Sequence, residues 1–174
     1  GCGACEGVCP QNAIDMRTDD MGFPYPYIRN NLCISCGRCK AVCAFQKPGT
    51  DENEPFDRKV YALKHLDVNA RTTSSSGGAF SLLADAVLAR RGVIYGVGRD
   101  TSLCAEYKCA EDKVGYEEMR GSKYMQACSD KAYRMALDDL DRGRVVLFTG
   151  TPCQIAGIRS LKGGNCENLY TVDV

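Results

Sequence analysis

The sequence predicts an α+β protein, in which a small cysteine-rich module is followed by an α/β domain. Seven of the twelve cysteines lie within the first 43 residues, in two similar groups. A polar stretch rich in Pro, Gly and acidic residues comes next, and from residue 60 onward short β-rich runs alternate with helical periodicity. We therefore place the module at 1–48, a linker at 49–59 and the α/β domain at 60–174.

Composition and charge exclude several classes of function. The 174 residues carry 22 basic and 22 acidic side chains, so no net field attracts nucleic acid or an anionic membrane. No apolar run reaches the roughly 20 residues that span a bilayer, and no signal peptide is visible. Cysteines in metal-ligand spacing favour a reducing compartment, so we expect a cytoplasmic protein. The chain begins inside a motif and ends in a strand-like run, which predicts a fragment truncated at both ends.

The second cysteine group has the full spacing of a bacterial ferredoxin cluster loop, Cys33-x2-Cys36-x2-Cys39-x3-Cys43. Two-residue gaps let one short loop place three thiolates around an iron–sulfur cube. The fourth thiolate then reaches a second cluster. We expect this module to be ordered by its metal centres.

The first group, Cys2-x2-Cys5-x3-Cys9-Pro10, repeats the second at an offset of 34 residues. The counterpart of Cys33 would precede Gly1, so we expect it to be missing from the fragment. The exchange of fourth ligands predicts two metal sites. One uses Cys33, Cys36, Cys39 and Cys9, and the other uses Cys2, Cys5, Cys43 and the missing cysteine.

Zinc is the alternative occupant, because C-x2-C pairs also occur in zinc knuckles. Four cysteines within eleven residues, with the pattern duplicated in the first group, fit 4Fe-4S clusters better. Full cysteine ligation leaves no iron open to a substrate, so we expect the clusters to relay electrons.

The predicted α/β domain begins with a strand at 60–63. A helix follows at 79–90, then a strand at 93–97. Ser129 can cap a helix in which residues 133, 136, 137 and 140 share one face, ahead of a buried strand at 145–148. Pro152 suits the first turn of a further helix, and 168–174 reads as a last strand.

Three segments of this domain are candidate ligand sites. Arg71 to Gly78 precedes a helix, where backbone N–H groups favour anions. Gly121 to Tyr124 combines a cation, a hydroxyl and an aromatic ring. Phe148 to Gln154 leaves a buried strand and enters a helix, where open α/β sheets bind ligands. Read singly, these segments are also ordinary caps and turns.

With the cysteine groups, these segments resemble the family of coenzyme F420 hydrogenase and dehydrogenase beta-subunits. The resemblance covers nearly the whole chain. It rests on the paired cluster motifs, Gly22-Phe-Pro24, Thr73-Ser-Ser-Ser-Gly-Gly-Ala79, Gly121-Ser-Lys-Tyr124 and Gly150-Thr-Pro-Cys-Gln154. It implies a ferredoxin-like two-cluster 4Fe-4S module joined to the N-terminal part of a flavin-binding α/β domain. Electrons would pass between clusters, FAD and a substrate such as coenzyme F420.

A flavin also fits the redox logic, since clusters exchange single electrons whereas F420 or a nicotinamide exchanges a hydride. The resemblance implies flavin-phosphate contacts at Ser75, Ser76, Gly77 and Gly78. Lys123 would steady negative charge on flavin or substrate, and Thr151 and Cys153 would lie near the flavin or the electron path. Lys123 and Cys153 are the catalytic candidates. A redox partner protein or ferredoxin would complete the pathway.

Several alternatives stay open. Lys123 is equally readable as a solvated lysine, Cys153 as a packed residue and Tyr124 as core. We read His65 as a surface residue, and Cys104, Cys109, Cys128 and Cys166 as mainly structural. A non-catalytic electron carrier, with a second domain that only docks a partner, is the rival to the oxidoreductase.

Overall fold

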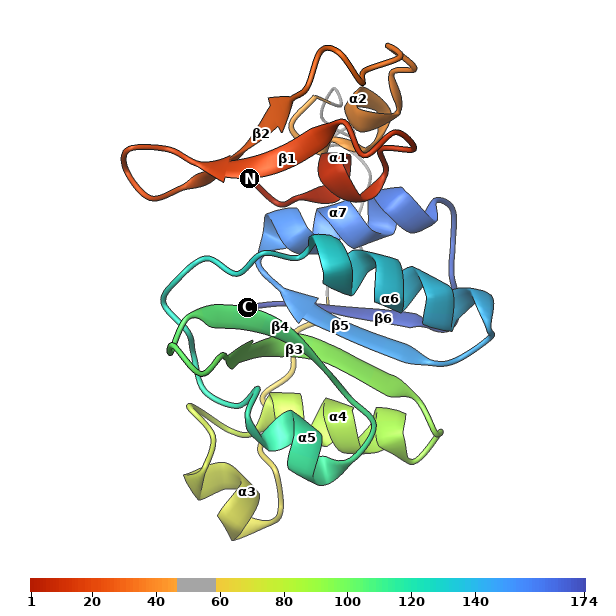
Figure 1. The fold of residues 1–174 in the computed structure, drawn as a ribbon. Coiled ribbons are helices and arrows are strands. Elements are labelled where there is room, and N and C mark those ends of the chain that lie inside the picture. The colour runs from red at the N-terminus through yellow and green to blue at the C-terminus, as the bar shows by residue number, and fades with distance from the viewer. Residues whose placement is uncertain (47–58) are drawn as a thin grey trace.

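The computed structural model describes residues 1–46 and 59–174, and Figure 1 shows its ribbon. The predicted linker, residues 49–59, lies outside this described part except for its last residue. A small N-terminal module rests on one face of a layered α/β domain. No helix in these described ranges is both long and apolar enough to cross a bilayer.

The N-terminal module is built from two similar halves. Helix α1, Ala4–Gly7, and helix α2, Arg38–Val42, each follow a cysteine and a glycine. Gly3 and Gly37 both adopt left-handed backbone conformations, with φ of 79° and 75°, which a side chain would disfavour. Between the halves runs an antiparallel hairpin of β1, Ile14–Thr18, and β2, Pro24–Ile28. The sequence repeat at offset 34 thus has a structural counterpart.

The α/β domain contains a four-stranded mixed sheet in the order β4-β3-β5-β6. Strands β3, Val93–Arg99, β5, Val146–Gly150, and β6, Leu169–Asp173, are parallel, so their carboxyl ends share one edge. Strand β4, Ala105–Ala110, pairs antiparallel to β3. Figure 1 shows the C-terminus at the edge where β3 and β5 end.

Helices cover both faces of this sheet (Figure 1). Helices α6, Asp130–Asp141, and α7, Pro152–Lys162, lie on the face that carries the N-terminal module. Helices α4, Ala79–Leu88, and α5, Lys113–Glu117, lie on the other face, and α3, Val68–Thr72, stands below them. The helices predicted at 79–90, after Ser129 and at Pro152 are therefore confirmed.

Side-chain alternation along the strands divides the core in two. Tyr95 and Phe148 point into the layer beneath α6 and α7, whereas Ile94 and Leu147 point into the layer above α4 and α5. Buried strands with apolar residues on both faces are the expected centre of such a sheet. The strands predicted at 93–97, 145–148 and 168–174 are confirmed by β3, β5 and β6.

The strand predicted at 60–63 is wrong. Residues 59–66 form no strand, and Val60 and Tyr61 are exposed. The segment runs beside the serine-rich loop, where the His65 N–H donates to the Gly77 carbonyl at 2.7 Å. β-branched and aromatic residues favour a strand only when a sheet edge is available to pair with them.

Candidate functional site

The cysteine set Cys9, Cys33, Cys36 and Cys39 lines one cavity of about 230 Å³. Cys9 follows α1, while the other three come from the loop before α2 and from its first turn. The turn at Gly37 brings this loop around the cavity. We call these four residues the outer set, because Cys33 and Cys36 are exposed. The structure thus brings together the four residues that the sequence predicts as ligands of one cluster.

The outer set has features suited to a charged sulfur site. The Cys9 Sγ already accepts a hydrogen bond from the Ala13 N–H at 3.2 Å. Bonds of this kind stabilise thiolates and tune the potential of iron–sulfur clusters. Ile14 and Ile28 close the cavity on the hairpin side. The thiols of the outer set therefore line a cavity that is partly apolar and partly open to solvent.

Cys2, Cys5 and Cys43, which we call the inner set, lie near one another at the base of the module. Burial raises the pKa of the Cys5 thiol above its usual value, and the neighbouring Cys2 and Cys43 thiols raise it further. All three residues are partly buried. The three remaining predicted ligands are thus also neighbours.

The outer set surrounds a volume rather than a single point. Within residues 1–46 and 59–174, no three His, Cys, Asp or Glu side chains converge closely enough to hold one metal ion. The outer cavity, about 230 Å³ with thiols on several sides, fits a polynuclear cluster held at its corners.

The inner set touches the α/β domain. The Cys2 carbonyl accepts hydrogen bonds from the Ser129 hydroxyl at 2.6 Å and the Tyr133 hydroxyl at 3.0 Å. Ala4 and Val42 join the core cluster formed by α6 and α7. Sequence reasoning missed this contact, because it assigned Ser129 to a helix cap that its side chain does not make.

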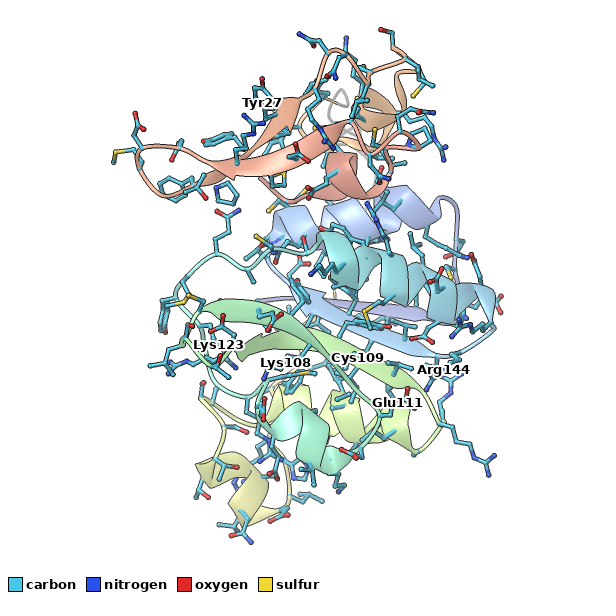
Figure 2. All side chains as sticks on the ribbon, in the orientation of Figure 1. Tyr27, Lys108, Cys109, Glu111, Lys123 and Arg144 are labelled. Atoms are coloured by element: carbon cyan, nitrogen blue, oxygen red, sulfur yellow. The ribbon has the colours of Figure 1, made fainter. Side chains whose placement is uncertain are left out.

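A second cavity, of about 540 Å³, lies at the carboxyl end of β3. Its walls carry two acidic side chains, Asp100 and Glu118, and four cationic ones, Arg99, Lys108, Arg120 and Lys123. We call it the cationic pocket. Figure 2 shows Lys123 and Lys108 toward one end of the sheet and Glu111 and Arg144 toward the other. The excess of positive charge suits an anionic ligand.

Lys123 is held by its own loop. Its Nζ donates to the carbonyl oxygens of Arg120 at 2.7 Å and Glu118 at 3.1 Å. Burial lowers the pKa of Lys123 below its usual value, and the nearby cations Arg99 and Lys108 lower it further. The lysine is therefore an ordered wall of the pocket rather than a freely solvated side chain. Tyr124, read as either core or flavin stack, is fully open to solvent.

The serine-rich loop reaches the edge of this pocket. The Ser75 hydroxyl accepts a hydrogen bond from the Ser122 N–H at 3.3 Å, and Arg120 Nη1 donates to the Thr73 hydroxyl at 2.7 Å. Ser75 and Ser76 are exposed. The structure thus brings the serine loop and the Gly121–Lys123 loop together, although they are far apart in sequence.

Gly77 and Gly78 pack against the chain segment around His65. A Cβ at Gly77 would lie 2.7 Å from the Leu63 carbonyl oxygen, and one at Gly78 would lie 3.0 Å from the His65 Cβ. This close approach explains both glycines by packing. Their phosphate contacts stay a prediction.

Thr151 and Cys153 form a separate group where β5 enters α7. The Thr151 hydroxyl lies 3.3 Å from the Cys153 Sγ. Thr151 also forms a capping box with Gln154. Gln154 is buried, and its Oε1 accepts a hydrogen bond from the Tyr107 hydroxyl at 3.0 Å. These residues do not line the cationic pocket, but they share the edge at which the parallel strands end.

The other singled-out residues have varied environments. Of the four cysteines expected to be mainly structural, only Cys166 packs against the core. The other three are exposed: Cys104, Cys109 and Cys128. His65 is partly buried, with 16% of its side chain exposed, and its Nδ1 accepts a hydrogen bond from the Asp67 N–H at 3.1 Å. It lies at the surface but is not fully open to solvent.

Known proteins resemble this chain in two ways. Residues 1–47 match the 4Fe-4S dicluster domain family. Over 181 residues the chain is 28% identical to a subunit of the F(420)H(2) dehydrogenase of Methanosarcina mazei, an alignment covering 98% of the chain and 50% of that protein. Over 64 residues it is 33% identical to Ferredoxin 7Fe of Hydrogenibacillus schlegelii, covering 37% of the chain and 76% of that protein.

The chain therefore spans about half the length of the dehydrogenase subunit that it resembles. The dicluster match falls on the cysteine-rich module. Iron–sulfur electron transfer is the function these likenesses share. We conclude that the chain belongs, through its N-terminal module, to the ferredoxin-type 4Fe-4S dicluster family, and that a mixed α/β domain follows this module.

Proposed function

We propose that the chain is part of an iron–sulfur flavoprotein oxidoreductase of the F420 hydrogenase/dehydrogenase beta-subunit type. Electrons pass between two 4Fe-4S clusters, FAD and a two-electron substrate such as coenzyme F420. The observation that carries the proposal is the convergence of Cys9, Cys33, Cys36 and Cys39 on one cavity. The alignment over 98% of the chain with part of an F420H2 dehydrogenase supports the choice of substrate.

The outer and inner sets would hold the two clusters. Cys9, Cys33, Cys36 and Cys39 supply four thiolates to one, while Cys2, Cys5 and Cys43 supply three to the other. Bound clusters supply one-electron exchange. The protein's own part is to hold the thiolates in place and to screen the inner set from solvent through the packing of Ala4 and Val42.

The cationic pocket would receive an anionic part of FAD or of the substrate. Lys123, fixed by two carbonyl oxygens, places a positive charge on its wall, and Ser75 and Ser76 offer hydroxyls at the adjoining edge. Thr151 and Cys153, at the end of β5, lie where open α/β sheets bind ligands. Bound FAD supplies the conversion between one-electron and hydride chemistry.

An anaerobic ultraviolet–visible spectrum of the holoprotein tests this proposal. We expect a broad iron–sulfur absorbance together with flavin bands, and iron and acid-labile sulfide in equal amounts. Clusters without flavin would favour the rival, an electron carrier whose α/β domain docks a partner. Zinc without iron or sulfide would overturn the cluster assignment.

A steady-state assay with F420, NAD(P)H and reduced ferredoxin then identifies the substrate. The proposal predicts exchange with F420 and with a one-electron protein carrier. The cysteine content in metal-ligand spacing supports a reducing, cytoplasmic setting for this exchange. Activity with NAD(P)H alone would retain the oxidoreductase and reject F420.

A further inference from the structure

We propose that Ser129 and Tyr133 are positioning residues for the inner set, and that their hydroxyls raise the reduction potential of the centre held by Cys2, Cys5 and Cys43. The inference rests on the cluster binding proposed above. It assigns a role to two residues, at the start of α6 and within it, that lie more than 120 positions from the cysteine they contact. It also distinguishes the inner set from the outer set in function.

Both hydroxyls point at one backbone atom. Ser129 Oγ donates to the Cys2 carbonyl oxygen at 2.6 Å, and Tyr133 Oη lies 3.0 Å from the same oxygen. The Tyr133 Oη is also 3.1 Å from the Gln154 carbonyl oxygen, so its single proton is shared between the two acceptors. The α/β domain thus hydrogen-bonds the backbone carbonyl of Cys2, a predicted cluster ligand.

The Ser129 hydroxyl does not cap its own helix. Ser129 occupies the N-cap position of α6, yet its side chain makes no capping bond. An N-cap serine ordinarily uses its side-chain oxygen as the acceptor of such a bond, at a gain of about 1 kcal/mol. Here its hydroxyl is turned to Cys2 instead. Both side chains are buried, at 2% and 0% exposure, so solvent does not weaken the contact.

Packing holds this arrangement in place. Ala4, two residues after Cys2, is buried against α7, where Gly157 leaves room for it. Tyr133 is also clamped by its stacked contact with Phe148, with ring centroids 5.6 Å apart. The inner set is therefore attached to the sheet through a rigid aromatic residue. The outer set instead includes the exposed Cys33 and Cys36.

The electrostatic effect has a definite sign. Each hydroxyl places a partly positive hydrogen beside the Cys2 peptide. Reduction adds one negative charge to a bound cluster, so nearby donors favour the reduced state. Loss of a donor should therefore make the inner centre harder to reduce. A centre held by the outer set should be unaffected.

Redox titration of the holoprotein, followed by electron paramagnetic resonance, tests this inference with Ser129→Ala and Tyr133→Phe. We expect the equilibrium constant for reduction of the inner centre to fall about twofold to tenfold for each lost hydrogen bond. A tenfold change corresponds to about 59 mV for one electron. The Cys36→Ser protein, which lacks an outer ligand, identifies which signal belongs to the inner centre.

Two further variants make the test decisive. Tyr116→Phe is the matched control, because Tyr116 is equally buried but donates to Asp85 on the opposite face of the sheet. Ser129→Thr retains a hydroxyl, so its inner centre should keep a reduction potential close to that of the unmutated protein. If Ser129→Ala and Tyr133→Phe both keep the potential of the unmutated protein and its full iron content, the inference is overturned but the proposed function is not. Absence of iron and sulfide from the unmutated protein would overturn the proposed function and the inference together.

Discussion

At the scale of single residues, Cys36 is the sharpest test of the outer set. It is exposed and lies on the wall of the 230 Å³ cavity. Cys36→Ser replaces a soft thiolate with a weak oxygen ligand. We expect about half of the iron and sulfide to be lost and the N-terminal module to unfold more readily, because folding there is coupled to metal. Metal and sulfide analysis, together with proteolysis, measures both effects.

Cys104 provides the matched control for this substitution. It is an equally exposed thiol outside both cysteine groups. Cys104→Ser should leave iron, sulfide and protease resistance unchanged. Equal iron in Cys36→Ser and the unmutated protein would contradict the assignment of the outer set.

Lys123 offers a second residue-scale prediction. Lys123→Met keeps much of the side-chain length but removes the charge from the cationic pocket. We expect the affinity for FAD or F420 to fall about tenfold or more, the usual effect of losing a hydrogen bond to a charged group. Because the pKa of Lys123 is lowered, its charge is lost at a lower pH than for an ordinary lysine. Affinity should therefore decrease on the alkaline side as pH rises through that lowered pKa.

Fluorescence titration with FAD and with F420 measures this affinity. Lys131→Met, at an exposed position of α6, is the control and should bind both ligands normally. If Lys123→Met binds as tightly as the control does, the pocket is not the anion site.

The cysteine ligands were predictable because their spacing is local in the sequence. The cationic pocket was not, since Arg99, Lys108 and Arg120 come from β3, β4 and the loop after α5. Only the pairing of the strands brings them together. The contact made by the Ser129 side chain was missed for a similar reason. Its local sequence favours a cap, whereas its actual partner, Cys2, lies 127 residues away.

At the scale of elements, periodicity predicted α4 and α6 because each buries one face against the sheet, whereas α7 was predicted from Pro152 in its first turn. The buried strands β3 and β5 were recognisable as apolar runs. The segment 60–63 has the composition of a strand, but no strand of the described residues, 1–46 and 59–174, pairs with it. Strand formation depends on a partner that composition alone does not reveal.

The crossing of α1 over α7 gives an element-scale prediction. A Cβ at Gly157 would lie 2.7 Å from the Tyr133 Oη and 3.3 Å from the Ala4 Cβ. Glycine to alanine in a helix usually stabilises by about 1 kcal/mol. Gly157→Ala should instead destabilise by about 1–2 kcal/mol, since overpacking costs more than the helix propensity returns. Urea unfolding of the holoprotein measures the difference.

A double variant identifies the source of this destabilisation. Tyr133→Phe removes the nearest atom to the added methyl group. Gly157→Ala should therefore cost less in the Tyr133→Phe background than alone. Additive effects of the two substitutions would show that the clash lies elsewhere.

At the scale of the whole molecule, three tyrosines surround Phe148, two of them buried and Tyr107 partly buried. Tyr107, Tyr133 and Tyr95 have ring centroids 5.1, 5.6 and 6.1 Å from it. Burial raises the pKa of each above its usual value, and for Tyr95 a hydrogen bond to Asp139 raises it further. These residues link β3, β4, β5 and α6 into one unit.

This arrangement predicts alkaline unfolding. The unfolded chain loses tyrosine protons near pH 10 while the folded protein retains them, so stability is complete below that pH and lost above it. Each tyrosine contributes a slope of about 1.4 kcal/mol per pH unit. Phenolate absorbance should show the three ionising only as the protein unfolds.

Gly157 has one more consequence, which concerns distance rather than stability. Electron tunnelling slows exponentially as the gap between donor and acceptor widens. By omitting a side chain where α1 rests on α7, the protein brings the inner cysteines closer to the sheet than any other residue would allow. A methyl group here would act as a spacer, slowing exchange between module and domain even where the driving force stayed the same.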